Sequence, residues 1–318
     1  MLPLDPRLPG PAREAALAAA RPEEPVAARD ALVVLTSGTT GEPKAAVLTH
    51  DAVAASARAT STRLAVDPTS DRWLACLPLA HVGGLGVVTR ALLTGTPLTV
   101  VPDVRQASGD ATLVSLVPAL LPRVDAARFR TIVLGGSAMP PDLPANAVAT
   151  YGLTESGGGI VYDGVPLDGV EIRVDAAGQI HLRAPMLLRA YRDGHDPRDA
   201  DGWLPTGDAG AWDGATLGVS GRIGDVIVTG GEKVWPTTVE ARLTEHPDVR
   251  EALVFGRADP TWGRRVVARV VPANPRQPPT LDAVRGWVKE TLPPWSAPHE
   301  LELADTLPRT ALGKLKRY

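Results

Sequence analysis

A nine-residue stretch near the N-terminus combines the groups that bind phosphate in proteins. Its four hydroxyl side chains, two glycines and one lysine are Thr36, Ser37, Thr39, Thr40, Gly38, Gly41 and Lys44. Glycine lets backbone N–H groups turn toward an anion, the hydroxyls donate further hydrogen bonds, and Lys44 adds a positive charge. The Gly-Lys-Ser/Thr ending of a Walker A loop is absent, so the stretch indicates a polyphosphate loop of another kind. A flexible surface turn is the alternative that these residues alone leave open.

A second polar cluster, residues 151–156, contains Thr154 and Glu155 and is followed by three glycines. A carboxylate in such a loop is a natural Mg²⁺ ligand beside substrate phosphates, because this ion prefers hard oxygen donors. A solvated glutamate in a turn is the alternative. Upstream, Gly135 and Gly136 follow an apolar run, and paired glycines at a strand end either let a flat ring approach the backbone or form a simple turn.

Three further features contain candidate site residues, and each feature taken alone is a weaker indication of function. Asp208 can accept hydrogen bonds from both hydroxyls of a ribose, and Arg222 can reach a ribose or a phosphate. His81 lies between Pro and Gly residues that predict a strand-to-helix turn at a pocket wall, although a lone histidine in an apolar stretch is more often a core or capping residue. Lys314 lies in a basic C-terminal tail, which is usually solvated charge unless a separable domain carries it into an active site.

The composition narrows the class of protein. The 318 residues are 44% apolar and 22% charged with a net charge of −3, which is ordinary for a globular chain and argues against a nucleic-acid partner. The one cysteine, Cys76, excludes an intrachain disulfide and a cysteine metal cluster, and it suits a reducing compartment. The apolar stretch 15–20 is too short for a signal peptide, and no run approaches the ~20 apolar residues of a membrane helix. We therefore expect a cytoplasmic protein without membrane insertion.

Apolar runs and helical stretches alternate over residues 31–150, which predicts an α/β domain with a largely parallel sheet. The expected helices of this region cover 50–63 and 82–94, and the expected strands cover 31–36, 72–77, 97–101, 112–117 and 131–134. Short alternating segments at 169–174, 179–183 and 215–219 predict antiparallel strands of a small barrel-like region.

The pattern changes again near Arg222, and the last part of the chain predicts a compact α+β unit. Its expected helices are 236–245 and 280–291, and its expected strands are 226–229, 249–255, 265–271 and 299–304. We predict an N-terminal domain over residues 1–224 and a smaller, mobile C-terminal domain over residues 225–318.

Taken together and in this order, the clusters resemble the core motifs of the adenylate-forming superfamily of acyl-CoA synthetases, luciferases and adenylation domains. The resemblance extends from residue 31 to residue 318. Within that superfamily, residues 151–169 (YGLTESGGGIVYDGVPLDG) are similar to the short, actinobacterial-type o-succinylbenzoate–CoA ligases of menaquinone biosynthesis. The resemblance implies a shortened N-terminal domain, a hinge near Asp225 and a C-terminal domain that rotates between two half-reactions. A homodimer partner is a possible cover for the shortened side of the site.

The resemblance also implies roles for the candidates in an enzyme that uses ATP, Mg²⁺ and CoA with a carboxylic acid. The residues of the 36–44 loop would hold the β- and γ-phosphates, Thr154 the α-phosphate and Glu155 the Mg²⁺. The residues that would frame the adenine are Gly135, Gly136, Tyr151 and Gly152. Asp208 and Arg222 would hold the ribose, and Lys314 would bridge the attacking carboxylate and the α-phosphate.

For the second half-reaction the resemblance implies that Gly230 and Gly231 line a pantetheine tunnel, with Trp262 near CoA. Candidates for recognising the polar ends of the acid are His81, Ser137, which follows the adenine-framing glycines, and Ser156. Two alternatives stay open: an enzyme of the same class with another acid or a carrier-protein acceptor, and a non-catalytic nucleotide-binding relative.

Overall fold

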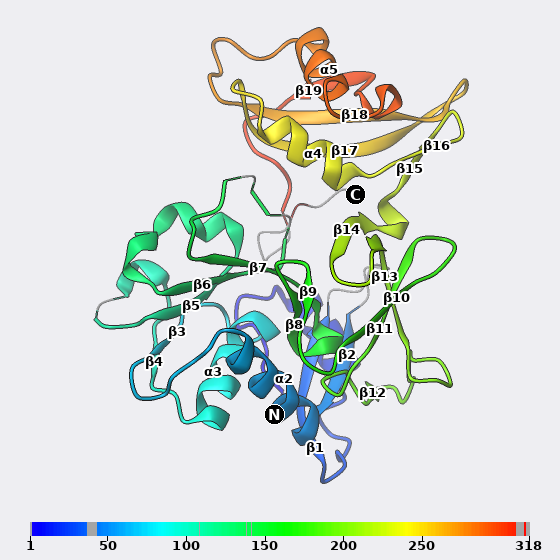
Figure 1. Cartoon of the computed structure of the whole chain (residues 1–318). Coiled ribbons are helices and arrows are strands. Elements are labelled where there is room, and N and C mark those ends of the chain that lie inside the picture. Colours follow the sequence, from blue (N-terminus) through cyan, green and yellow to red (C-terminus); the bar gives the residue numbers. More distant parts are fainter. Residues whose placement is uncertain are drawn as a thin grey trace. The chain divides into compact units, whose positions relative to one another are not determined.

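The computed structural model describes residues 2–36, 43–107, 109–137, 139–140, 142–309 and 315 (Figure 1). The chain divides into two compact units. The first consists of Met1–Asp175, Ile180–Thr206 and Trp212–Gly218, and the second of Ala176–Gln179, Gly207–Ala211 and Val219–Tyr318. Each unit has a hydrophobic core of its own. The predicted α/β class is confirmed, whereas the boundary at residues 224 and 225 stays a prediction.

A seven-stranded sheet is the centre of the first unit. Its strand order is β4 (Leu98–Val100), β3 (Trp73–Ala75), β5 (Leu113–Leu116), β6 (Thr131–Leu134), β7 (Ala147–Leu153), β8 (Gly158–Tyr162) and β9 (Val165–Pro166). The pairs from β4 to β7 are parallel, and β8 and β9 are antiparallel additions. The strands β3, β5 and β6 are almost wholly buried, as expected for a parallel sheet that is covered on both faces.

Two helices pack on each other and on this sheet: α2 (His50–Arg63) and α3 (Val82–Thr94). The first begins where the Thr49 side chain accepts a hydrogen bond from the backbone N–H of Ala52, a standard N-terminal cap. The second ends at Gly95 in the left-handed conformation, a common helix terminus. Both helices match the predicted ranges 50–63 and 82–94.

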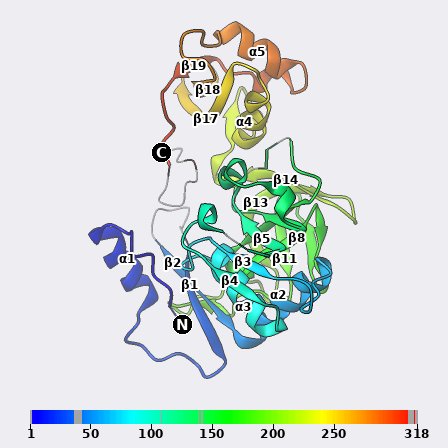
Figure 2. The same ribbon diagram turned by 90° about the vertical axis from the view of Figure 1, so that its left-hand side faces the viewer.

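A three-stranded sheet consists of β1 (Asp30–Thr36), β2 (Lys44–Thr49) and β12 (Ala190–Tyr191), all antiparallel. One face of the β1–β2 pair joins the main core, and the other face carries a small cluster that includes Val33 and Val47. Helix α1 (Gly10–Ala20) contacts both strands and lies beside them in Figure 2. The expectation that residues 31–36 belong to the parallel sheet is therefore wrong, because these residues pair with the unpredicted strand β2.

The predicted barrel-like region is a four-stranded sheet in the order β10 (Glu171–Val174), β11 (Gln179–Arg183), β13 (Leu204–Trp212) and β14 (Leu217–Arg222). In the second unit a sheet combines β15 (Ile227–Thr229), β16 (Glu232–Val234), β17 (Val249–Asp259), β18 (Gly263–Pro272) and β19 (Glu300–Leu303). Helices α4 (Pro236–Thr244) and α5 (Leu281–Lys289) contribute to its core. Among the described residues, no helix is long and apolar enough to cross a bilayer.

Short 3-10 helices connect these elements. They are η1 (Val104–Gln106), η2 (Pro118–Arg123), η3 (Ala126–Arg128), η4 (Thr154–Ser156), η5 (Ile223–Asp225) and η6 (Pro294–Ser296). Of these, η4 carries candidate residues of the site, because it contains Thr154 and Glu155.

Candidate active site

The ends of the predicted phosphate loop are fixed by strand pairing. Thr36 ends β1, Lys44 begins β2, and the two residues are direct partners in the antiparallel register. The other candidates of the loop, Ser37, Gly38, Thr39, Thr40 and Gly41, lie outside the described residues. The described part of the loop therefore places one hydroxyl and one ammonium side by side at the end of a hairpin.

Glu155 lies on η4, directly after β7. Its backbone carbonyl accepts a hydrogen bond from Leu188 N at 2.7 Å, and its Oε1 accepts one from the Tyr191 hydroxyl at 2.7 Å. The described residues offer Oε2 no hydrogen bond, and they contain no group of three or more acidic, His or Cys side chains suited to a metal. A single carboxylate with one oxygen available fits Mg²⁺, because this ion takes one or two protein carboxylates and completes its shell with phosphate oxygens and water.

The neighbouring Ser156 has a different role from the one suggested by the sequence. It is fully buried, and its hydroxyl accepts from Leu153 N at 2.9 Å and lies 2.8 Å from the carbonyl of Gly158. These bonds hold the turn between β7 and β8 closed. The hydroxyl of Ser156 is thus used to build the turn that carries Glu155.

The adenine candidates lie at the carboxyl ends of two neighbouring parallel strands. Gly135, Gly136 and Ser137 directly follow β6, whereas Tyr151 and Gly152 lie near the end of β7. The two strand ends are joined because Thr150 Oγ1 donates to the carbonyl of Leu134 at 2.8 Å. Ligands of open α/β sheets bind at this edge, so the sheet brings the two predicted clusters together.

Tyr151 and Gly152 were expected in a loop and lie in a strand instead. The backbone of β7 approaches that of β8 so closely that a Cβ on Gly152 would stand 2.0 Å from the carbonyl oxygen of Gly158. The glycines that suggested a turn therefore permit a close antiparallel pair.

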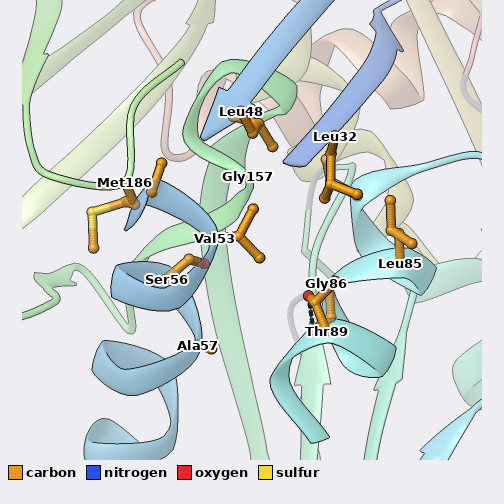
Figure 3. Close-up of a pocket in the computed structure, with 12 residues that line it drawn as sticks. Leu32, Leu48, Val53, Ser56, Ala57, Leu85, Gly86, Thr89, Gly157 and Met186 are labelled. Atoms are coloured by element: carbon orange, nitrogen blue, oxygen red, sulfur yellow. Dashed lines mark hydrogen bonds between the residues drawn. The ribbon is translucent and has the colours of Figure 1, made fainter. Parts of the chain in front are cut away.

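A small pocket lies between α2, α3 and the β1–β2 pair (Figure 3). Its apolar lining includes Leu32, Leu48 and Leu85, and its hydroxyl groups are those of Ser56 and Thr89. Gly157, next to η4, closes one side. The pocket therefore lies beside the turn that carries Glu155.

His81 is the residue that precedes α3. Its Nε2 lies 3.9 Å from a carboxylate oxygen of Asp5, a buried residue of the N-terminal segment. Asp5 also accepts hydrogen bonds from the backbone and guanidinium of Arg7, and the side-chain bond to Arg7 is the main cause that lowers the pKa of Asp5 to about 2. The N-terminal segment thus places a stable negative charge beside His81.

Arg90, on α3, is a buried cation in the described structure. Its guanidinium lies over the Trp73 ring, with 4.7 Å to the centroid, and its Nε and Nη1 are buried without a hydrogen-bond partner among the described residues. Its Nη2 lies 4.0 Å from the position that a Cβ on Gly86 would occupy, and Gly86 lines the pocket. Burial lowers the pKa of Arg90. An unpaired buried guanidinium beside a pocket is suited to an anionic ligand.

The ribose candidates bond to each other. Arg222 Nε lies 2.8 Å from Asp208 Oδ1, and the Asp208 side chain is only 9% exposed. Both residues belong to the second unit, as do Gly230, Gly231 and Trp262, whereas the adenine and metal candidates belong to the first. The candidate residues thus divide between the two units.

The CoA candidates form one contact within the second unit. Gly230 and Gly231 make the turn between β15 and β16, and Gly230 N donates to the carbonyl of Trp262 at 2.9 Å. Gly230 has φ +57, and a Cβ there would stand 2.9 Å from the indole. Trp262 is 49% exposed, so part of its surface is accessible to a ligand.

Lys314 lies outside the described residues. The residues on either side of its segment, Arg309 and Leu315, form an isolated antiparallel bridge. Leu307 and Leu315 pack with Leu253 and Val271, and Arg309 forms an ion pair with Glu251.

Comparisons with known proteins agree with this arrangement. The family model of the AMP-binding enzymes matches residues 3–191, and that of the AMP-binding enzyme C-terminal domain matches residues 238–314. The chain therefore belongs to the AMP-binding enzyme family, the adenylate-forming class that its motifs resemble.

Among its relatives is the probable 2-succinylbenzoate–CoA ligase of Mycobacterium tuberculosis (strain CDC 1551 / Oshkosh), which is 41% identical over 336 residues, covering 96% of this chain and 87% of the relative. The structure of the Bacillus subtilis o-succinylbenzoate CoA synthetase MenE with its acyl-adenylate intermediate matches with a TM-score of 0.79 and 29% identity, over 91% of this chain and 69% of that one. The same enzyme with ATP and magnesium matches with a TM-score of 0.80 and 28% identity, over 93% and 71%.

Three residues that the sequence did not single out have contacts in the candidate site: Asp5, Arg90 and Tyr191. Asp5 is far from His81 in the sequence, and Tyr191 is far from Glu155, so neither pair leaves a local pattern. Arg90 is one of many arginines, and its distinguishing feature among the described residues is that two of its nitrogens are buried without a hydrogen-bond partner.

Proposed function

We propose that this protein is an AMP-forming acid–CoA ligase that converts 2-succinylbenzoate to its CoA thioester through an acyl adenylate. Membership of the AMP-binding enzyme family and the 41% identity to a probable 2-succinylbenzoate–CoA ligase support the class and the acid. The observation that carries the choice of acid is Arg90, because two nitrogens of its guanidinium are buried without a hydrogen-bond partner among the described residues. A buried charge of this kind calls for an anionic ligand. An acid with a second carboxylate supplies that anion.

In the first half-reaction a carboxylate oxygen of the acid attacks the α-phosphorus of ATP, and pyrophosphate leaves. Two anions must approach each other, so the task of the site is to align them and to offset their repulsion. Lys44 and the hydroxyls around it bind the β- and γ-phosphates, and Thr154 binds the α-phosphate. Glu155 supplies a carboxylate for Mg²⁺, which when bound offsets the charge of the phosphates. Lys314 stabilises the charge that develops between the reacting groups.

Recognition of the acid falls to the pocket beside η4. The lining of this pocket is apolar, but the pocket is too small in this structure for an aromatic ring, so we propose that its side chains move apart to admit the ring. Arg90 pairs with the carboxylate that is not activated. His81, held beside Asp5, lies at the start of the same helix and binds the polar end of the acid that reacts. A monocarboxylic acid would leave Arg90 unpaired, which is the physical reason for preferring a dicarboxylate to another aryl acid.

In the second half-reaction the CoA thiolate attacks the acyl carbonyl, and AMP leaves with its phosphate oxygen. We assign the approach of pantetheine to Gly230 and Gly231, because the turn that they form lies against the exposed Trp262. We assign Lys314 no part in this step, because the reacting atom is now the acyl carbon and no bond to phosphorus forms or breaks.

The proposal also covers the location and the oligomeric state of the enzyme. We infer that it acts in the cytoplasm, where ATP and CoA are supplied. We also propose a second copy of the chain as a partner. Nucleic acid is not among the expected partners. Sedimentation at several protein concentrations measures the oligomeric state directly.

Acid-dependent exchange of labelled pyrophosphate into ATP tests the proposal in the absence of CoA. We expect exchange with 2-succinylbenzoate, and we expect Glu155→Gln to reduce it strongly. Exchange with benzoate at the same efficiency would contradict the assigned acid, and an absence of exchange with any acid would contradict the adenylate mechanism.

A further inference from the structure

Tyr191 lies between two candidate residues that come from distant parts of the sequence. It belongs to β12, whose register pairs Tyr191 with Ala46 of β2, two residues from Lys44. The next residue, Arg192, donates its N–H to the carbonyl of Ala45 at 2.8 Å, and the preceding segment donates from Leu188 N to the carbonyl of Glu155 at 2.7 Å. The backbone therefore fixes Tyr191 against both the phosphate-loop hairpin and the turn of Glu155.

The hydroxyl and the ring of Tyr191 contact different residues: the hydroxyl contacts Glu155 and the ring contacts Lys44. Its hydroxyl donates to Glu155 Oε1 at 2.7 Å, and the Lys44 Nζ lies over its ring, with 5.1 Å to the centroid. The His195 ring is stacked on it at 6.1 Å with an interplanar angle of 16°. The ring is thus held in place while its hydroxyl and its face each contact one charged residue.

We propose that Tyr191 is the positioning residue that sets the Mg²⁺ ligand and the phosphate-loop lysine relative to each other. The hydroxyl occupies one carboxylate oxygen of Glu155, so that the other is presented to the metal in a fixed orientation. The ring holds the ammonium of Lys44 by a cation–π interaction, which steers it without neutralising its charge. This inference rests on the proposed function, since it assumes that Glu155 and Lys44 bind MgATP.

The two contacts can be removed separately, because they use different atoms of one side chain. Tyr191→Phe deletes the hydroxyl and keeps the ring under Lys44 and against His195. Tyr191→Leu deletes both contacts. Tyr162→Phe is a matched control. It deletes the phenol hydroxyl of a buried tyrosine in the same unit, which is hydrogen-bonded to Thr60 Oγ1 at 3.2 Å.

Isothermal titration with ATP, in Mg²⁺ and separately in EDTA, tests the inference without any acid or CoA. We expect Mg²⁺ to tighten ATP binding to the wild type and to Tyr162→Phe by the same factor. In Tyr191→Phe we expect that Mg²⁺-dependent gain to fall by about tenfold or more, as is usual when the partner that orients a metal ligand is lost. Its affinity in EDTA should be unchanged, whereas Tyr191→Leu should also lose about two- to fivefold in EDTA.

The outcomes separate this inference from the proposed function. An unchanged Mg²⁺-dependent gain in Tyr191→Phe, no such gain in the wild type, or an equal loss in Tyr162→Phe would overturn the positioning role. A folded Tyr191→Phe with the expected loss supports it even if Tyr191→Leu does not fold. The proposed function fails on a different result, namely ATP binding with no turnover of the acid, and a wild type that does not bind ATP would overturn both.

Discussion

Replacing Arg90 by methionine should make the enzyme more stable and less able to use its acid. Methionine keeps an unbranched, flexible side chain in the same space and removes the charge. In the described structure two nitrogens of Arg90 are buried without hydrogen-bond partners, and its guanidinium lies over the Trp73 ring. The variant therefore loses little that holds the fold together.

The magnitudes follow from these contacts. Each buried, unsatisfied donor costs about 1–3 kcal/mol, whereas the cation–π contact with Trp73 returns about 0.5–2 kcal/mol. We expect the free energy of unfolding to rise by about 1 kcal/mol or more in the absence of ligand. Loss of a buried charge pair with the substrate costs about 3 kcal/mol, which lowers kcat/KM for 2-succinylbenzoate roughly 10²-fold.

Denaturant unfolding checks the change in stability, and steady-state kinetics check the change in kcat/KM. The kinetics compare 2-succinylbenzoate with monocarboxylates that lack one of its two carboxylates, namely 4-oxo-4-phenylbutanoate and 2-butanoylbenzoate. Only the compound that retains the reacting carboxylate can be turned over, and we expect Arg90→Met to leave its kcat/KM within about threefold of the wild type. Arg130→Met is the matched control, because Arg130 pairs at 2.7 Å with the buried Asp71 and its loss should cost about 1–3 kcal/mol of stability. An equal loss of kcat/KM on both acids, or a destabilised Arg90→Met, would refute the reasoning.

Three further predictions concern single residues. Lys314→Ala should slow adenylation on the order of 10²–10³-fold and spare thioester formation from supplied acyl adenylate, so equal losses in both assays would exclude separate half-reaction roles. Because the pKa of Asp5 is lowered from its ordinary value of 3.8 to about 2 in the folded protein, its contribution to stability is present above about pH 4 and is lost as the pH falls toward 2. The free energy of unfolding of Asp5→Asn, measured with denaturant, should therefore depend less on pH over this range than that of the wild type, and parallel curves would count against it. Gly152→Ala places a Cβ 2.0 Å from the Gly158 carbonyl oxygen and should cost about 3 kcal/mol or more in unfolding free energy, whereas Gly224→Ala, which meets nothing within 4 Å, should be nearly neutral.

Helices and strands with a clear pattern of apolar residues could be predicted from the sequence. The helices at 50–63 and 82–94 and the buried strand at 131–134 agree with α2, α3 and β6, because their apolar patterns are long or continuous. The prediction failed where glycine dominates. Residues 147–162 form the paired strands β7 and β8, since glycine lets two backbones approach closely as well as turn.

The candidate site shows a similar division. Glu155, Gly135 and Gly136 could be proposed as site residues from the sequence because local motifs surround them, and their roles stay predictions. The contacts of Glu155 with Tyr191 and of His81 with Asp5 could not be predicted, because each joins residues that are distant in the chain and depends on how β12 and the N-terminal segment fold back. The burial of Arg90 is likewise a property of packing around α3 and Trp73, which leaves no signal in the sequence nearby.

Release of AMP from purified protein tests the central claim most directly. The protein is incubated with MgATP, CoA and 2-succinylbenzoate, and each component is omitted in turn. The account predicts AMP and thioester in equal amounts only when all components are present. Multiple-turnover AMP release without CoA would point to another acceptor, and no release with the complete mixture would contradict the proposed ligase.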